Sequence, residues 1–205
     1  KCGTVTALTV GGERAIEALR TAVAMWADNA IHVKVACEPD TYLAARALAE
    51  ALKREKLNII FTGKQAIDDD QCAMIGYLAE LLDFPSASVI MKCDISADKT
   101  KATLEQEADG GAKVIIETPL PAVIGVTKGI NTPRYASLPG IMKAKKKEIR
   151  VYSLSDLGLA EEAVKTTDGE YELPPERQPG KKLSGDAAAQ AKQLVQLLRE
   201  EAKVI

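Results

Sequence analysis

Segments with strand character alternate with segments of helical periodicity along this chain, and this alternation limits the possible folds more than any other feature. Residues 4–10 (TVTALTV) are rich in β-branched side chains and end at Gly11-Gly12, which predicts a strand followed by a turn. Residues 13–26 then carry apolar side chains at helical spacing. Such alternation is typical of α/β proteins, in which right-handed crossovers connect the strands of a mostly parallel sheet.

The rest of the chain continues this pattern. Residues 58–61 (NIIF) form a short continuous apolar run, as expected for a strand buried on both faces of a parallel sheet. Residues 31–35 alternate apolar and polar side chains, which predicts a half-exposed strand, and Asp109-Gly110-Gly111 predicts a hairpin turn. The other expected elements are strands at 88–95, 103–107, 113–117 and 121–127 and helices at 41–56 (N-cap Thr41), 71–83 and 186–202.

The candidate ligand site follows from a general rule of open α/β sheets. Ligands bind at the carboxyl ends of the strands, near the point where the strand order switches. This rule selects residues 10–12 and residues 62–70. Gly63 lets backbone N–H groups approach a ligand, and a helix that begins near Gln71 offers a partly positive N-terminus. Both features favour a phosphate group.

Three consecutive aspartates, residues 68–70, complicate this interpretation. Their carboxylates would repel a phosphate if they pointed toward it, whereas acidic residues in the first turn of a helix are also expected as caps. A magnesium site would suit three aspartates, although adjacent residues rarely converge on one ion. The loop matches neither G-x-x-x-x-G-K-[ST] nor G-x-G-x-x-G, so these residues alone leave the ligand open.

Residues 131–147 (NTPRYASLPGIMKAKKK) are unlike an ordinary core element. Leu138 lies between two turn-forming prolines, and a short amphipathic run and four lysines follow. Because proline biases the preceding residue toward extended geometry, Thr132 and Leu138 are expected on a projecting loop. An exposed apolar residue with a rim of lysines is a candidate anchor for a protein partner. The alternative is a loop that returns Leu138 to the core and leaves only its lysines in solvent.

Three stretches of the chain resemble the electron transfer flavoprotein beta subunit. Residues 131–146 read N-x-P-R-Y-A-x-L-P-x-I-M-K-A-K-K, and residues 62–70 read TGKQAIDDD. Residues 20–33 also match, except that Trp26 stands where the family usually has Gly. The resemblance extends over nearly the whole chain and implies a Rossmann-like, adenine-nucleotide-hydrolase-like fold with helices on both faces of the sheet. Because family members usually begin earlier, with a further strand and loop, that N-terminal strand and loop are expected to be missing here.

The resemblance implies that this chain holds a structural AMP, largely through backbone amides. By alignment, the residues that would line the nucleotide are Val10, Gly63, Lys64, Gln65, Ala66, Asp69, Cys72, Ala73 and Met74. The last three replace polar family residues whose side chains donate hydrogen bonds to the phosphate, so AMP is expected to bind more weakly or through the backbone alone. Some relatives hold a second FAD in this pocket, beside a D-G-D-T loop. Asp69-Asp70-Gln71 favours AMP here.

The resemblance also implies the partners. An alpha subunit would hold FAD near the interface, and the heterodimer would carry electrons from flavin dehydrogenases of the acyl-CoA dehydrogenase type, as in fatty acid oxidation. Leu138 would insert into an apolar pocket of the dehydrogenase. The implied docking residues are Arg134, Tyr135, Leu138, Ile141, Met142, Lys143, Lys145 and Lys146. The resemblance thus implies an electron carrier subunit and not an enzyme. The residues themselves offer no Ser-His-Asp set, because the one histidine, His32, is expected to be a structural residue within a strand.

The composition excludes several other classes of protein. With 27 basic and 29 acidic residues the net charge is −2, so nothing favours nucleic acid or direct membrane insertion. One histidine and four scattered cysteines make a zinc site improbable. Reduced cysteines indicate a cytosol-like compartment, with bacterial cytoplasm favoured over the mitochondrial matrix. Cys72 lies near a predicted helix N-terminus, but a buried apolar role is favoured for it.

The chain is expected to have two parts. Residues 1–157 would form the α/β nucleotide-binding domain, and residues 158–205 an extended arm and a terminal helix that pack on the partner subunit. The alternative function is a nucleotide-binding, stress-protein-like regulatory module without a redox role. That alternative accounts for the sheet but leaves the lysine-rimmed Leu138 and the proline-rich arm without a role.

Overall fold

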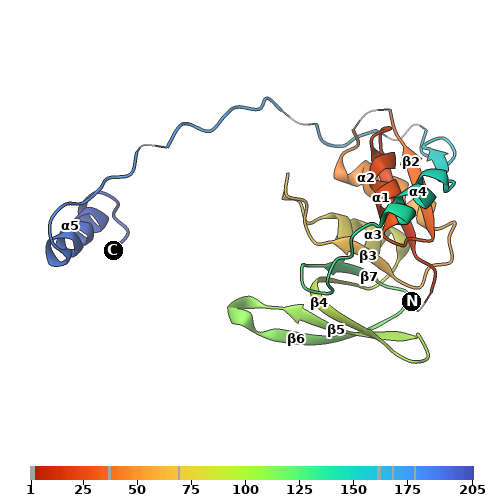
Figure 1. Cartoon of the computed structure of the whole chain (residues 1–205), viewed down its shortest axis with the longest axis horizontal. Helices are drawn as coiled ribbons and strands as arrows, with labels where there is room; N and C mark the ends of the chain where they lie inside the picture. The colour runs from red at the N-terminus through yellow and green to blue at the C-terminus, as the bar shows by residue number, and fades with distance from the viewer. Residues whose placement is uncertain (1–2, 37, 69, 161–162, 168, 178) are drawn as a thin grey trace. The chain divides into compact units, whose positions relative to one another are not determined.

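The computed structural model describes residues 3–36, 38–68, 70–160, 163–167, 169–177 and 179–205. The chain divides into two compact units, Lys1–Thr167 and Asp168–Ile205. The first unit contains β1 to β8 and α1 to α4, and the second contains α5 (Figure 1). Each unit is described by itself below.

A three-stranded parallel sheet carries the first strands of the chain. Its order is β1 (Thr6–Gly11), β2 (Asn29–Lys34) and β8 (Arg150–Ser153). Residues 30–33 of β2 are all buried, and successive side chains of a strand point to opposite faces, so both faces of this central strand are covered. The prediction of a half-exposed strand was therefore wrong. His32 is fully buried, and its Nε2 lies 2.9 Å from the carbonyl oxygen of Gly11, which confirms its structural role.

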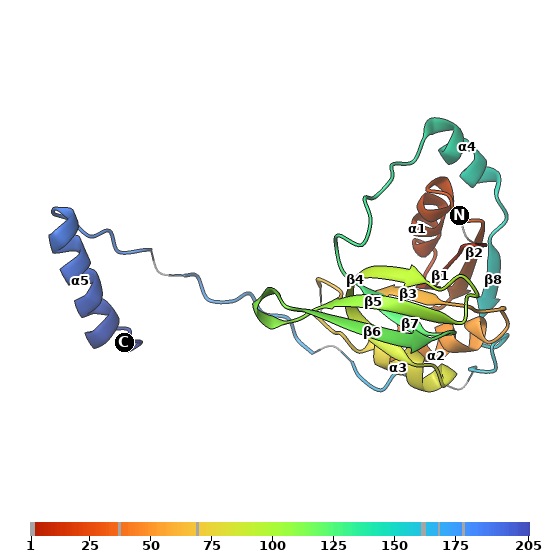
Figure 2. The same cartoon turned by 90° about the horizontal axis from the view of Figure 1, so that it is seen from below.

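A second sheet of five strands combines a parallel half with an antiparallel hairpin (Figure 2). In spatial order its strands are β3 (Ile60–Gly63), β7 (Val123–Val126), β4 (Ser86–Ile95), β5 (Lys101–Glu107) and β6 (Lys113–Pro119). The strands β3, β7 and β4 are parallel, whereas β5 and β6 run antiparallel and are joined by a turn at Asp109–Gly111. The turn has Gly110 at φ 69° and Gly111 at φ 78°, which confirms the predicted hairpin.

Helices complete the first unit and confirm the α/β class, although the strands form two separate sheets. The helices of the chain are α1 (Ala15–Ala24), α2 (Thr41–Leu52), α3 (Met74–Leu82), α4 (Leu138–Lys146) and α5 (Ala187–Glu200). Both α1 and α2 pack against β1 and β2, α3 packs against β4 and β7, and α2 packs against α3. Residues 127–137 run without helix or strand from β7 to α4, and α4 lies on α1 (Figure 2).

The packing of α3 on the second sheet depends on Gly125 of β7. A Cβ atom at this position would lie 2.1 Å from Cδ1 of Ile75, a buried residue of α3. Val123 and Leu78 belong to the same buried cluster as Ile75. Glycine therefore lets the helix approach the carboxyl ends of β3 and β7, where the candidate ligand loop begins.

Asp40 joins the start of α2 to a segment that is distant in sequence. Its Oδ1 accepts a hydrogen bond from the Leu43 N–H at 2.8 Å, which makes Asp40 the N-cap of α2 in place of the predicted Thr41. Its Oδ2 accepts from the backbone N–H groups of Lys165 at 2.6 Å and Thr166 at 2.9 Å. Burial raises the pKa of Asp40, but these hydrogen bonds outweigh it, so its pKa lies below the ordinary value of 3.8.

We expect Asp40→Ala to lower the free energy of unfolding by about 1–2 kcal/mol at pH 7, because a cap and two further backbone donors lose their acceptor. Since the pKa is lower in the folded state, the contribution of the charge is complete above pH 3.8 and declines as the pH falls through the folded pKa. Asp40→Asn is the matched control, since asparagine caps about as well and does not titrate. Urea unfolding at pH 7 and pH 3 tests this. If the free energy of unfolding of the wild type exceeded that of Asp40→Asn by the same amount at both pH values, the stabilising role of the Asp40 charge would be contradicted.

The second unit consists of an extended segment and α5. Asp186 caps α5 by accepting from the Ala189 N–H at 2.8 Å, close to the predicted start of a terminal helix. Lys181 and Glu201 form an ion pair at 2.6 Å. None of the described residues of α5 is buried, and Leu194 and Val195 are exposed. The packing of residues 158–205 on a partner subunit stays a prediction.

Candidate functional site

Leu138, the predicted anchor, lies at the first position of α4. Ser137 is the N-cap of this helix and accepts a hydrogen bond from the Gly140 N–H at 3.2 Å. The expectation that Leu138 lies on a loop was therefore wrong, because a serine cap and a proline in the first turn, where no intrahelical N–H donor is lost, begin a helix here. The side chain of Leu138 is 80% exposed and that of Tyr135 is 95% exposed. The alternative in which Leu138 returns to the core is not observed.

One packing contact and two hydrogen bonds fix α4 on α1. The carbonyl oxygen of Ala24 lies so close to Gly140 that a Cβ atom there would be 2.9 Å from it. The guanidinium of Arg20 donates to the carbonyl oxygens of Ala144 and Lys147, at the carboxyl end of α4. Ala144 itself is buried. Because a cation and close packing fix both ends of this short helix, it presents Leu138 from a defined position.

The predicted docking residues of α4 lie on its exposed surface. Ile141 and Met142 are exposed apolar side chains, and Lys143, Lys145 and Lys146 are exposed cations in the last turn. Cations at a helix C-terminus also interact favourably with the helix dipole, so part of their role is local. The structure therefore brings exposed apolar side chains and exposed lysines together on one helix.

The loop after β3 has the open backbone that the sequence predicts for a ligand loop. A Cβ atom on Gly63 would meet nothing within 4 Å, and Lys64, Gln65 and Ala66 are exposed. The Lys64 N–H donates to the Val126 carbonyl at 3.1 Å, which ties the loop to the end of β7. The Gln65 amide donates to Oδ1 of Asp70 at 3.0 Å. Asp69, another predicted contact, lies outside the described residues.

The helix that follows this loop begins later than expected. It starts at Met74 and not near Gln71, so Asp68 and Asp70 do not belong to its first turn. No side chain caps it, because its N-cap is Ala73. Backbone N–H groups at an uncapped helix start suit a phosphate oxygen, and the open loop backbone supplies further donors. These residues could hold a phosphate group through main-chain contacts, with little help from side chains.

Cys72 is exposed, so the expected buried role for this residue was wrong. Its sulfur lies 3.8 Å from the Asp70 carbonyl oxygen, at the end of the loop. Gln71 lies beside the N-terminus of α2, since Thr41 Oγ1 donates to its side-chain oxygen at 2.7 Å. Among the described residues, no hydrogen bond joins Val10 to this loop, because β1 and β3 belong to different sheets.

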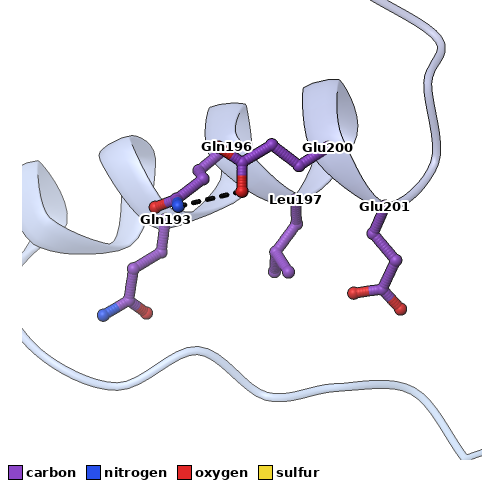
Figure 3. Close-up of a pocket in the computed structure, with 5 residues that line it drawn as sticks. All are labelled: Gln193, Gln196, Leu197, Glu200 and Glu201. Atoms are coloured by element: carbon purple, nitrogen blue, oxygen red, sulfur yellow. Dashed lines mark hydrogen bonds between the residues drawn. The ribbon is translucent and has the colours of Figure 1, made fainter.

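Two cavities are lined by no described residue of the predicted ligand loop, residues 62–70. One, of about 630 Å³, is lined by residues before β1 and β3 and includes Trp26 and Arg134. The other, of about 600 Å³, is an open groove along α5 (Figure 3). There the side chains of Gln193, Leu197 and Glu201 point to one side, while Gln196 donates to Glu200 at 3.1 Å. The described residues contain no cluster of three metal-ligating side chains, and none of the described helices is long and apolar enough to cross a membrane.

The fold and the site define a class before any comparison. Parallel-rich open sheets with packed helices, and a glycine loop leading to an uncapped helix, define a Rossmann-like α/β domain, here with an exposed leucine at the start of α4. Residues 1–157 match the model of the electron transfer flavoprotein domain. The chain belongs to the electron transfer flavoprotein family, among the beta subunits.

Individual relatives support this assignment. The chain is 44% identical to the electron transfer flavoprotein subunit beta of Bacillus subtilis, over 99% of this chain and 80% of the relative. It is 37% identical to the mitochondrial beta subunit of Arabidopsis thaliana, over 98% of this chain and 77% of that protein. The human beta subunit is 39% identical, over 93% and 75% of the two chains. The resemblance that the sequence motifs predicted is confirmed.

Proposed function

We propose that this chain is the beta subunit of a heterodimeric electron transfer flavoprotein, that it binds AMP structurally, and that it docks flavin dehydrogenases of the acyl-CoA dehydrogenase type through Leu138. The observation that carries the proposal is an 80% exposed leucine on a helix fixed at both ends. An exposed leucine adds nothing to the core of this chain, whereas it suits a pocket on a partner. Family membership favours this role over a stress-protein-like regulatory module.

The role of this chain in electron transfer is to bind and position. FAD, held mainly by the alpha subunit, supplies the redox chemistry when bound. Leu138 enters an apolar pocket of the dehydrogenase, and Lys143, Lys145 and Lys146 orient the encounter with an acidic rim. A small apolar contact with a charged rim suits a complex that forms quickly and dissociates quickly.

The loop of residues 63–66 and the first turn of α3 hold the adenylate in this proposal. Main-chain N–H groups donate to its phosphate, since Cys72, Ala73 and Met74 supply no strong side-chain donor. A second FAD in place of AMP is the alternative occupant. The arm and α5 pack on the alpha subunit, which would cover the exposed Leu194 and Val195.

Purification of the native assembly tests the proposal as a whole. We expect a yellow heterodimer with flavin absorbance, from which mass spectrometry of the extracted small molecules identifies AMP and FAD. A colourless homodimer would contradict the electron-carrier assignment. FAD at twice the molar amount of the heterodimer, without AMP, would identify the second flavin as the occupant of the pocket.

We expect AMP to slow the alkylation of Cys72, because the exposed thiol lies at the end of the loop that holds the phosphate in this proposal. The measurement is the rate of iodoacetamide labelling at Cys72, followed by peptide mass spectrometry, with the assembly freed of nucleotide and then saturated with AMP. We expect at least a several-fold slower rate with AMP. Cys93, which is half-buried on β4, is the internal control and should label at the same rate in both samples. Equal protection of both thiols, or of neither, would contradict this placement of AMP.

A further inference from the structure

Trp26 has a backbone conformation that is unusual for a large side chain. Its φ is 86°, in the left-handed region that favours glycine. It follows the C-cap Met25 of α1, and its N–H donates to the Val23 carbonyl at 3.0 Å, while the Ala27 N–H donates to the Ala22 carbonyl at 3.0 Å. This is the Schellman arrangement, whose left-handed residue is most often glycine. A tryptophan there is strained, and such strain persists only where the surrounding structure holds the residue.

Burial does not hold the side chain of Trp26. The indole of Trp26 is 64% exposed. The guanidinium carbon of Arg134 lies 5.4 Å from the centroid of the indole ring, within the range of a cation–π interaction. Among the described residues, Arg134 forms no ion pair with an acidic side chain. The indole is thus the partner that the structure shows for this cation.

The contact between Trp26 and Arg134 lies close to the start of α4 in the sequence. Arg134 precedes Leu138 by four residues, in the stretch without helix or strand that leads into α4. Farther along, Gly140 packs on the carbonyl of Ala24, and Ala144 accepts from Arg20. Residues of α1 and the residue just after its cap therefore hold the docking segment (residues 131–147) before, at and after the anchor.

We propose that Trp26 is a positioning residue of the docking segment: its indole holds Arg134 and so fixes the extended residues that lead to Leu138. This inference rests on the proposed docking function. A fixed segment loses less conformational freedom when the dehydrogenase binds, so Trp26 contributes to affinity without contributing to electron transfer within the bound complex. The ligand of the surface is a protein with an apolar pocket and acidic rim, complementary to Leu138 and its lysines.

The test compares the heterodimer carrying Trp26→Gly, Trp26→Phe, Arg134→Ala or both Trp26→Gly and Arg134→Ala. Trp26→Gly suits the backbone at φ 86° and removes the ring, so it is expected to fold. We expect it to raise the KM for the flavoprotein as electron acceptor about two- to five-fold, the range of an exposed cation–π contact, with kcat unchanged. Trp26→Phe should restore most of the affinity. Adding Trp26→Gly to Arg134→Ala should change KM no further.

A matched control breaks another exposed cation–π pair. The Lys165 ammonium lies 5.7 Å from the Tyr42 ring centroid, and Tyr42→Leu, on α2 and outside the proposed arm, is expected to leave KM unchanged. The inference is overturned if Trp26→Gly raises KM equally with and without Arg134, or if kcat falls while KM stays constant. Leu138→Ala, measured in parallel, separates the two proposals. A raised KM in Leu138→Ala with a normal KM in Trp26→Gly rejects only the role of Trp26, whereas a normal KM in both rejects docking itself.

Discussion

Replacing Leu138 with alanine is expected to lower kcat/KM for the electron-donating dehydrogenase about 30-fold, the loss expected for an interface anchor worth about 2 kcal/mol. The physical reason is that the apolar pocket on the dehydrogenase loses the side chain that fills it. Because Leu138 is 80% exposed in the chain, its truncation leaves no cavity in the core. Flavin content and the unfolding temperature should therefore stay at their wild-type values. Stopped-flow reduction of the flavoprotein by the dehydrogenase measures the effect.

Val114→Ala is the matched control for this experiment. Val114 is an exposed apolar residue, 45% accessible, on β6 of the second sheet and outside the docking segment. Its truncation should change the transfer rate less than two-fold, since surface substitutions outside an interface are usually small in effect. Wild-type transfer rates in Leu138→Ala with every acyl-CoA-type donor would show that the residue is not an anchor. Equal losses in both variants would indicate a general effect of exposed apolar surface.

The fold could be predicted wherever one residue pattern decided one element. The hairpin turn at residues 109–111 needs positive φ at two positions, and the two glycines at these positions predict the turn. By contrast, β8 was not predicted. The four residues of Arg150–Ser153 show no alternation of apolar and polar side chains, and they form a strand because they pair with β2. The error in β2 has a similar cause. His32 is polar in the sequence but buried in the sheet, where the Gly11 carbonyl satisfies one of its two ring nitrogens, Nε2.

The candidate site shows the same division. The sequence alone left open whether Leu138 is exposed or returns to the core, and the contacts that hold α4 come from α1, more than a hundred residues earlier. Arg20 carries no local signal of such a role. The sequence showed only that Trp26 stands where the motif usually has glycine. The structure adds that its φ is 86°, in the region that favours glycine. The late start of α3 could not be predicted either, because several polar residues compete to begin that helix.

The same substitution in two helices is expected to have opposite effects on stability. Gly76 and Gly140 are each the third residue of a nine-residue helix, α3 and α4. A Cβ atom on Gly76 would meet nothing within 4 Å, so Gly76→Ala should raise the free energy of unfolding by about 0.5–1 kcal/mol through helix propensity. At Gly140 the same atom would lie 2.9 Å from the Ala24 carbonyl oxygen and 3.1 Å from the capping Ser137 hydroxyl.

A contact with a backbone carbonyl cannot be relieved by rotating a side chain, so α4 must shift on α1. We expect the cost of overpacking, about 1–3 kcal/mol, to exceed the gain in propensity, and Gly140→Ala to lower the free energy of unfolding. The shift also displaces Leu138, so the KM for the flavoprotein should rise although Leu138 is intact. Urea unfolding with a shared m-value and stopped-flow reduction measure the two effects. If Gly140→Ala stabilised the protein as much as Gly76→Ala and left KM unchanged, the close contact between Gly140 of α4 and Ala24 of α1 would not hold α4 in place. The proposal that α1 positions Leu138 through this contact would then be wrong.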